Sequence, residues 1–225
     1  MDSSRRNFIK NSSIAAGAIL IGGNPAVQAT PLLPKPANSI PKWKGFNLLD
    51  FFSPDPSNAR PQTQEEHLKW MADWGFDFVR IPMAYPSYVK FDRDQDITIK
   101  RVRKFDRKAT DRVENLVYLA HKHGLHASIN LHRAPGFCVN AGFNEPYNLW
   151  KDEQAMDDFC HHWRFWAKRF KNVSRDKISF DLLNEPCLRE DMNDQHSKRS
   201  AIPGELYRKM ALRASEAVSY THLTL

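Results

Sequence analysis

Four short apolar runs, separated by longer stretches with helical periodicity, constrain the fold more than any other feature. The runs have strand length and span residues 46–49, 76–81, 126–131 and 178–183. The stretches between them carry apolar residues three or four positions apart, as amphipathic helices do. Strands that alternate with helices of ten or more residues form βαβ units around a parallel sheet. The sequence therefore predicts an α/β fold with four such units.

The expected helices span residues 63–74, 106–123, 153–171 and 203–217. Thr63 and Glu66 have the spacing of a capping box, which makes Thr63 the expected N-cap of the first helix. The third helix carries an aromatic stripe at helical spacing. Its members are Phe159, Trp163, Trp166 and Phe170. We expect this stripe to pack in the core and not to serve as a platform for sugars.

The first 29 residues are typical of a twin-arginine signal peptide. Arg5 and Arg6 precede a short, weakly apolar segment, and residues 27–29 suit cleavage after Ala29. This pattern predicts export to the periplasm or beyond, with no membrane attachment after cleavage; an uncleaved anchor is the alternative. Residues 30–41 contain four prolines and are expected to form an extended linker.

Composition and charge exclude several classes of protein. The net charge of the 225-residue chain is +7, and its most basic run, residues 100–104, is followed by Asp106 and Asp111. That mixture indicates a solvated face, so we expect no nucleic-acid partner. The three cysteines, Cys138, Cys160 and Cys187, form neither a disulfide framework nor a zinc-site spacing, although one bridge between Cys138 and Cys187 is left open. No cofactor is expected.

The fourth run ends in the sequence Asn184-Glu185-Pro186. Proline cannot donate to a sheet ladder and disfavours helix in the residue before it, so the strand stops there. An amide and a carboxyl group are thereby left side by side at the carboxyl end of a parallel strand. That end is where α/β proteins build their sites.

The four strand motifs, in their order and spacing, resemble glycoside hydrolase family 5, the cellulase-like retaining enzymes. The matching segments are residues 43–47, 78–82, 129–132 and 178–186. Asn130 stands where family members often carry aspartate. The resemblance implies a (β/α)8 TIM barrel of which residues 42–217 form about the first four βα units, because a complete barrel has roughly 250 residues.

The resemblance also implies roles for individual residues. Glu185 corresponds to the general acid/base, Asn184 to the donor to the sugar 2-hydroxyl, and Arg80 to the residue that keeps the nucleophile ionised. The expected subsite residues are His132, Asn47 and the loop aromatics Phe51, Tyr85, Tyr88 and Trp150. Read from the residues alone, Arg80 could instead pair with a structural acid, His132 could be a core histidine, and each aromatic could be loop packing.

The expected activity is hydrolysis of a β-linked polysaccharide or oligosaccharide by two carboxylates. The nucleophile of the family lies on the seventh strand, which this chain does not reach. Residues 218–225 resemble translated sequencing-adaptor sequence, and we expect a non-native tail there. We expect the full-length protein to be a monomer whose partner is its carbohydrate substrate.

Two other functions stay open at this point. A metal-dependent barrel hydrolase would need a His-x-His motif at the end of the first strand, where Asn47 stands instead. His121 and His123 lie in an expected helix, where residues two apart do not share a face. We therefore expect no metal site. A carbohydrate-binding relative that has lost catalysis is the non-enzymatic alternative, which the intact Asn184-Glu185 pair argues against.

Overall fold

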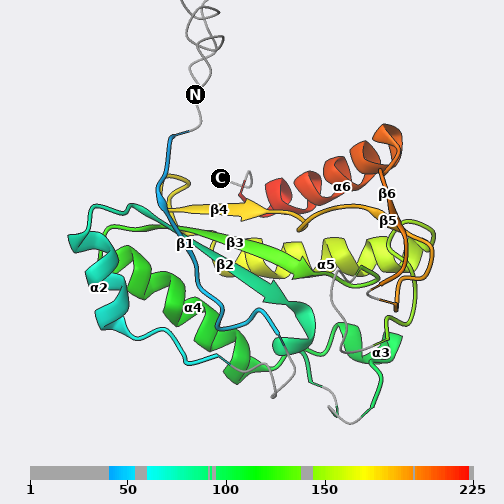
Figure 1. Ribbon diagram of the computed structural model, residues 1–225, viewed down its shortest axis with the longest axis horizontal. Coiled ribbons are helices and arrows are strands. Elements are labelled where there is room, and N and C mark those ends of the chain that lie inside the picture. The colour runs from blue at the N-terminus through cyan, green and yellow to red at the C-terminus, as the bar shows by residue number, and fades with distance from the viewer. Residues whose placement is uncertain are drawn as a thin grey trace, which may run out of the picture. The chain divides into compact units, whose positions relative to one another are not determined.

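The computed structural model describes residues 41–53, 60–90, 92, 95–137, 144–194 and 196–222. The expected signal peptide lies outside these residues, as does nearly all of the expected linker. Residues Lys42–Leu225 form one compact unit built around a four-stranded parallel sheet of order β1-β2-β3-β4 (Figure 1). Its strands are β1 (Gly45–Asn47), β2 (Phe78–Ala84), β3 (His126–Arg133) and β4 (Ile178–Asp181). The predicted α/β fold with four consecutive units is thereby confirmed.

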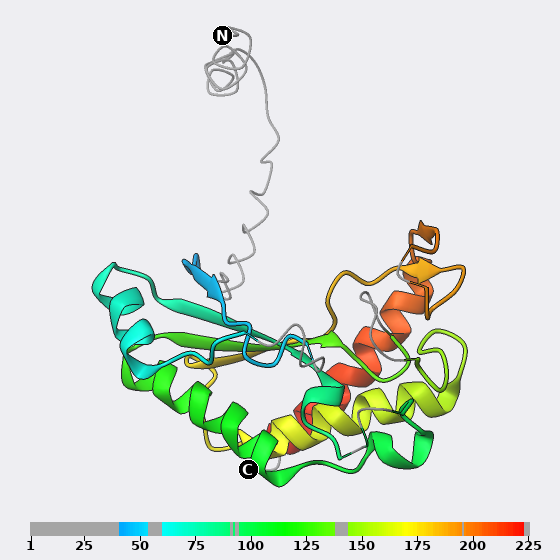
Figure 2. The same ribbon diagram turned by 60° about the horizontal axis from the view of Figure 1, so that its bottom comes forward.

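The helices that follow the strands lie along one face of this sheet, as Figure 2 shows for α4 and α5. The four main helices are α2 (Glu65–Asp73), α4 (Arg107–Lys122), α5 (Glu153–Arg169) and α6 (Gly204–His222), and two short ones are η2 (Tyr85–Ser87) and α3 (Ile99–Val102). Among the described residues, no helix is both long enough and apolar enough to span a bilayer. Helix α6 continues into the expected tail, through His222.

The N-cap of α2 is Gln64, so the predicted cap at Thr63 is wrong. The Gln64 amide donates to Nδ1 of His67 at 3.1 Å, which satisfies one of the free donors at the start of the helix. Thr63 serves another purpose, because its amide and its hydroxyl both donate to the Asp50 carboxylate at 2.7 Å. The loop after β1 is thereby tied to the start of α2.

Side chains alternate cleanly between the two faces of the sheet. In-register pairing places Val79 beside Ala127 and Ile81 beside Ile129, and all four side chains are fully buried. Phe180 follows in the same row on β4 and packs edge-on against Trp163 of α5, with ring centroids 5.7 Å apart. This face therefore forms the core under the helices. The aromatic stripe of α5 lies in that core with no exposed surface, as predicted.

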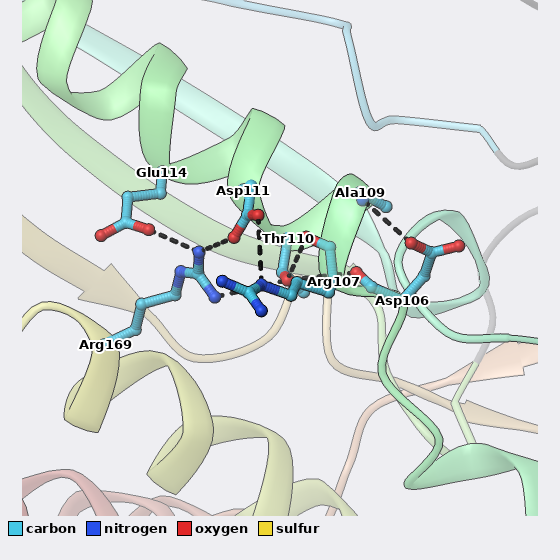
Figure 3. Close-up of polar contacts among 7 residues, drawn as sticks. All are labelled: Asp106, Arg107, Ala109, Thr110, Asp111, Glu114 and Arg169. Carbon is cyan, nitrogen blue, oxygen red and sulfur yellow. Dashed lines mark hydrogen bonds and ion pairs between the residues drawn. The ribbon is translucent and has the colours of Figure 1, made fainter.

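A polar cluster on the outer side of the core joins α4 to α5 (Figure 3). Asp106 caps α4 by accepting from the Ala109 amide at 3.2 Å. Arg169, the last residue of α5, forms ion pairs with Asp111 and Glu114 of α4. Neighbouring helices of the layer are thus linked by charge as well as by apolar contact.

An antiparallel hairpin of strands β5 (Leu188–Arg189) and β6 (Arg199–Ser200) follows the Asn184-Glu185 motif. It was not predicted, because each strand has only two residues and no hydrophobic alternation. It lies at the end of the sheet toward which the arrowheads of β2, β3 and β4 point (Figure 1).

Candidate functional site

Arg80, Asp181 and Asn184 form one connected group on the face of the sheet opposite the helices. The Arg80 guanidinium donates from Nε to Asp181 Oδ2 at 2.8 Å and from Nη2 to Asn184 Oδ1 at 3.0 Å. A planar guanidinium can hold two acceptors at once, whereas an ammonium cannot do so with the same geometry. The side-chain nitrogen of Asn184, Nδ2, is buried and meets no acceptor in hydrogen-bond geometry among the described residues, so it can donate to a ligand.

Asp181 is a site residue that sequence reasoning missed. The signal was present, because an acid inside an otherwise apolar strand needs a partner. Arg80, two strands away, supplies that partner. Arg80 therefore pairs with an acid of this chain, which was the alternative to its expected role beside the nucleophile.

Glu185 follows directly and has an unusual backbone. Its φ is +45°, and among the described residues it alone combines a side chain with a positive φ. Such a conformation costs about 1–3 kcal/mol and persists where the surroundings impose it, often at functional sites. Its carboxylate is 66% exposed and lies 3.5 Å from Arg199 Nη1 of the hairpin. The backbone thus turns this carboxyl group away from the sheet and into the open.

His132 lies at the end of β3, beside Asn184. The backbone amide of Asn184 donates to the Leu131 carbonyl at 3.1 Å, which holds the segment after β4 against β3. Burial lowers the pKa of His132, and the positive charge of Arg80 lowers it further. The ring is therefore neutral near pH 7. It packs against Phe52 of the first loop, with ring centroids 4.5 Å apart.

Asn47 is exposed at the end of β1 and is paired in register with Arg80. It therefore shares the open face of the sheet with Arg80 and, two residues further along, Asp181. The structure thus brings Arg80, His132 and Asn184 together, with Glu185 next to them and Asn47 on the same face.

The loop aromatics do not present rings to a sugar, and the expectation for them is wrong. Tyr85 and Tyr88 have no exposed surface, Phe51 is 5% exposed and Trp150 is 8% exposed. Each has an internal partner instead. The Tyr88 hydroxyl, for example, is bonded to His162 Nδ1 at 2.9 Å, and the Trp150 indole donates to the Cys187 carbonyl at 3.0 Å. These large aromatic side chains are buried in the core, where their apolar surface is removed from water.

Glu145 organises the loops around the site, and sequence reasoning missed it. Its side chain is fully buried and accepts from Arg133 Nε at 2.6 Å, from the Tyr85 hydroxyl at 2.8 Å and from the Gly136 amide at 3.1 Å. Its own amide donates to Asn193 Oδ1 at 2.8 Å. Burial and the neighbouring carboxylate raise the pKa of Tyr85 well above its usual value, so the phenol remains a donor. Glu145 thereby connects the loops that follow β2 and β3 through its carboxylate and the segment after β4 through its backbone amide.

No three His, Cys, Asp or Glu side chains converge on a common point in the part of the chain that the structure describes. Cys160 and Cys187 are free thiols, while Cys138 lies outside the described residues. The polar groups of the site are thus an arginine, amides, an imidazole and carboxylates at the carboxyl ends of parallel strands. These groups suit hydrogen bonding to hydroxyl groups and proton transfer at a glycosidic oxygen.

Comparison with known proteins agrees with this chemistry. The family model described as cellulase (glycosyl hydrolase family 5) matches residues 35–218. The chain belongs to glycosyl hydrolase family 5. The resemblance noted in its strand motifs is thereby confirmed, and the chain is a cellulase-family glycoside hydrolase sequence.

Curated relatives of the family 5 chain include a cellodextrinase and an endoglucanase. Cellodextrinase A of Ruminococcus flavefaciens is 32% identical over 146 residues, which are 63% of this chain and 40% of the relative. Endoglucanase C of Acetivibrio thermocellus is 29% identical over 121 residues, which are 54% of this chain and 32% of the relative. The chain thus spans less than half the length of these two relatives.

Solved structures give the same picture of the fold. A crystal structure titled a glycoside hydrolase matches with a TM-score of 0.63 and 29% identity, over 80% of this chain and 50% of that one. Cel5A of Thermotoga maritima, in complex with cellobiose, matches with a TM-score of 0.57 and 19% identity, over 80% of this chain and 48% of that one. The four-stranded parallel sheet therefore corresponds to about half of a family 5 TIM barrel.

Proposed function

We propose that this chain supplies the acid/base half of a retaining glycosidase that hydrolyses a β-linked glucan or related polysaccharide. The observation that carries the proposal is the left-handed backbone of Glu185 next to an asparagine held by Arg80. Strain of this kind has no evident benefit for packing, since the Glu185 side chain is mostly exposed. It does aim a carboxyl group outward from the end of the sheet, where a glycosidic oxygen would lie.

In the proposed reaction Glu185 protonates the leaving oxygen while a carboxylate from the other half of the barrel attacks the anomeric carbon. Glu185 then removes a proton from the water that cleaves the covalent intermediate. The Asn184 amide nitrogen donates to the 2-hydroxyl, and Arg80 holds its amide oxygen so that the nitrogen faces the sugar. The neutral His132 ring lies beside this amide and supports the same orientation.

The proposed partner half must do two things that this chain does not. It must provide the nucleophile, with its carboxyl group about 5–5.5 Å from that of Glu185, as retaining enzymes require. It must also cover Glu185, because this carboxyl group is 66% exposed in the present chain and a glycosidase cleaves its substrate in a site that excludes bulk water. We therefore propose activity for the longer protein that contains both halves.

The test compares Glu185→Gln with Glu190→Gln in that longer protein. Glu190 is an exposed glutamate of the same hairpin region, so its replacement removes the same charge nearby. Removal of a general acid/base costs about 10²–10⁴-fold in rate. We expect Glu185→Gln to lose at least about a hundredfold in kcat on β-glucan, and Glu190→Gln to keep most activity. Equal activity of Glu185→Gln and the parent would refute the assignment.

We also propose export by the twin-arginine route, which the paired Arg5 and Arg6 ahead of a weakly apolar segment support. Replacement of both by lysine keeps the charge but removes the guanidinium pair. The precursor is then expected to accumulate inside the cell. Processed protein that appears outside at an unchanged level would contradict this proposal.

A further inference from the structure

The β5–β6 hairpin covers a cavity of about 400 Å³ that plays no part in the site described above. This volume lies within the roughly 300–1,000 Å³ of sites for small ligands. Trp150 and Leu188 form its apolar wall. The Trp150 indole is held in place by its hydrogen bond to the Cys187 carbonyl. Little of the indole is exposed, so its edge and the Leu188 side chain are what the cavity offers to the apolar part of a sugar ring.

The charges around the cavity are unequal. Three cationic side chains line it, Lys151, Arg189 and Lys198, against the single carboxylate of Glu190. No carboxylate of the described residues lies within ion-pair distance of the Lys151 or Lys198 ammonium group. Arg189 is buried and is held by the Asp194 carbonyl, to which its Nη1 donates at 2.8 Å. A ligand that fills this space therefore meets an excess of positive charge.

The cavity is close to Glu185 but is separate from it. Arg199 contacts the Glu185 carboxylate, whereas its neighbours Lys198 and Ser200 line the cavity. The hairpin residues that line the cavity are therefore different from the one that contacts Glu185.

We propose that this cavity binds a sugar residue that carries a carboxylate, a uronic acid unit of a glycan. The carboxylate would pair with the lysines, the ring would lie against Leu188 and the exposed edge of Trp150, and Asn148 and Ser200 would meet the hydroxyls. A neutral glucan that excludes water from Lys151 and Lys198 offers these two ammonium groups no counter-charge, whereas a uronic acid does. The site would thus favour acidic glycans over neutral ones.

The test measures binding of the 225-residue chain by titration calorimetry. The probes are xylotriose substituted with one glucuronic acid and unsubstituted xylotriose. We expect the acidic probe to bind about tenfold or more tightly, and the double variant Lys151→Gln with Lys198→Gln to remove this preference. The control is Lys168→Gln with Lys171→Gln, which removes the same charge near the opposite end of α5. It should keep the preference.

Three results would overturn the proposal. They are equal affinity for the two probes, an equal loss of affinity in the control, and displacement of the acidic probe by an equal concentration of inorganic phosphate. The choice of a glycan rests on the proposed function, but binding is measured without hydrolysis. If the chain binds the acidic probe selectively but the longer protein is inactive, only the proposed function is refuted. If the longer protein is active but the chain binds the two probes equally, only this inference is refuted.

Discussion

The two faces of the sheet have opposite chemistry, although the same strands form both. Toward the helices, Val79, Ile81 and Ile129 are fully buried and apolar. On the other face, Arg80 and Asp181 are charged and partly exposed. The side chains of one strand therefore serve the core and the site in alternation.

The comparison shows which face the hydrophobic effect determines. Burial alone accounts for the residue types on the helical face, where the in-register strand positions described above carry apolar side chains. The open face contains charges inside strands, which burial does not favour and which need partners of their own. Substitutions on the helical face should therefore act mainly on stability, and those on the open face mainly on function.

The largest effect on stability is expected from Trp163→Ala. The side chain has no exposed surface and packs on Phe180, so the variant leaves a cavity that costs about 3–5 kcal/mol. Trp74→Ala is the control, because that side chain is 70% exposed and its loss should cost within about 0.5 kcal/mol. Urea unfolding followed by circular dichroism measures both. Similar costs for the two variants would contradict the described core.

Glu145→Gln tests the network that joins the loops and should cost about 3 kcal/mol. The variant leaves the Arg133 charge buried without its carboxylate, and the resulting loss of stability is larger than that from breaking an exposed ion pair. Lys69→Gln breaks the exposed pair with Asp73 and should cost less than about 1 kcal/mol. A Glu145→Gln variant as stable as Lys69→Gln would show that the loops do not depend on this carboxylate.

Asp181→Asn tests the open face. The variant keeps the shape but removes the charge that holds Arg80, in a pair whose carboxylate is 39% exposed. Solvent screening limits the loss of stability to about 1 kcal/mol. We expect a larger loss of kcat/KM in the completed enzyme, because Arg80 also orients Asn184. A loss confined to stability would contradict the division between the two faces.

The last prediction on stability is a pH dependence from His162, which is confined to acidic solution. Burial lowers its pKa to about 3, and its two ring nitrogens are bonded to Tyr88 and to the Val102 carbonyl. The unfolded state binds a proton below about pH 6.5 whereas the folded state does not. Stability should therefore be fully present above that pH and fall as pH decreases toward 3. A His162 NMR signal that titrates near pH 6.5 in the folded protein would contradict this.

The sequence predicted those parts of the molecule that follow from periodicity. The four strands, the aromatic stripe of α5 and the position of Asn184-Glu185 belong to this group, since each depends on local pattern. The Arg80–Asp181 pair and the Arg133–Glu145 pair were not predicted, because they join residues 101 and 12 positions apart by contacts that leave no periodic signal. Burial of Tyr85 was missed for the same reason: its partner lies 60 residues away.

The central claim is that Glu185 donates and retrieves the proton during glycoside cleavage. The most direct measurement is the dependence of the rate on the leaving group in Glu185→Gln, made in the completed enzyme. An activated aryl glycoside needs little protonation to depart, so its first step should remain fast, while natural β-glucan loses about 10²–10⁴-fold. Azide, which attacks the covalent intermediate without a base, should restore part of the turnover on the aryl glycoside. Equal loss on both substrates with no effect of azide would contradict the assignment of Glu185.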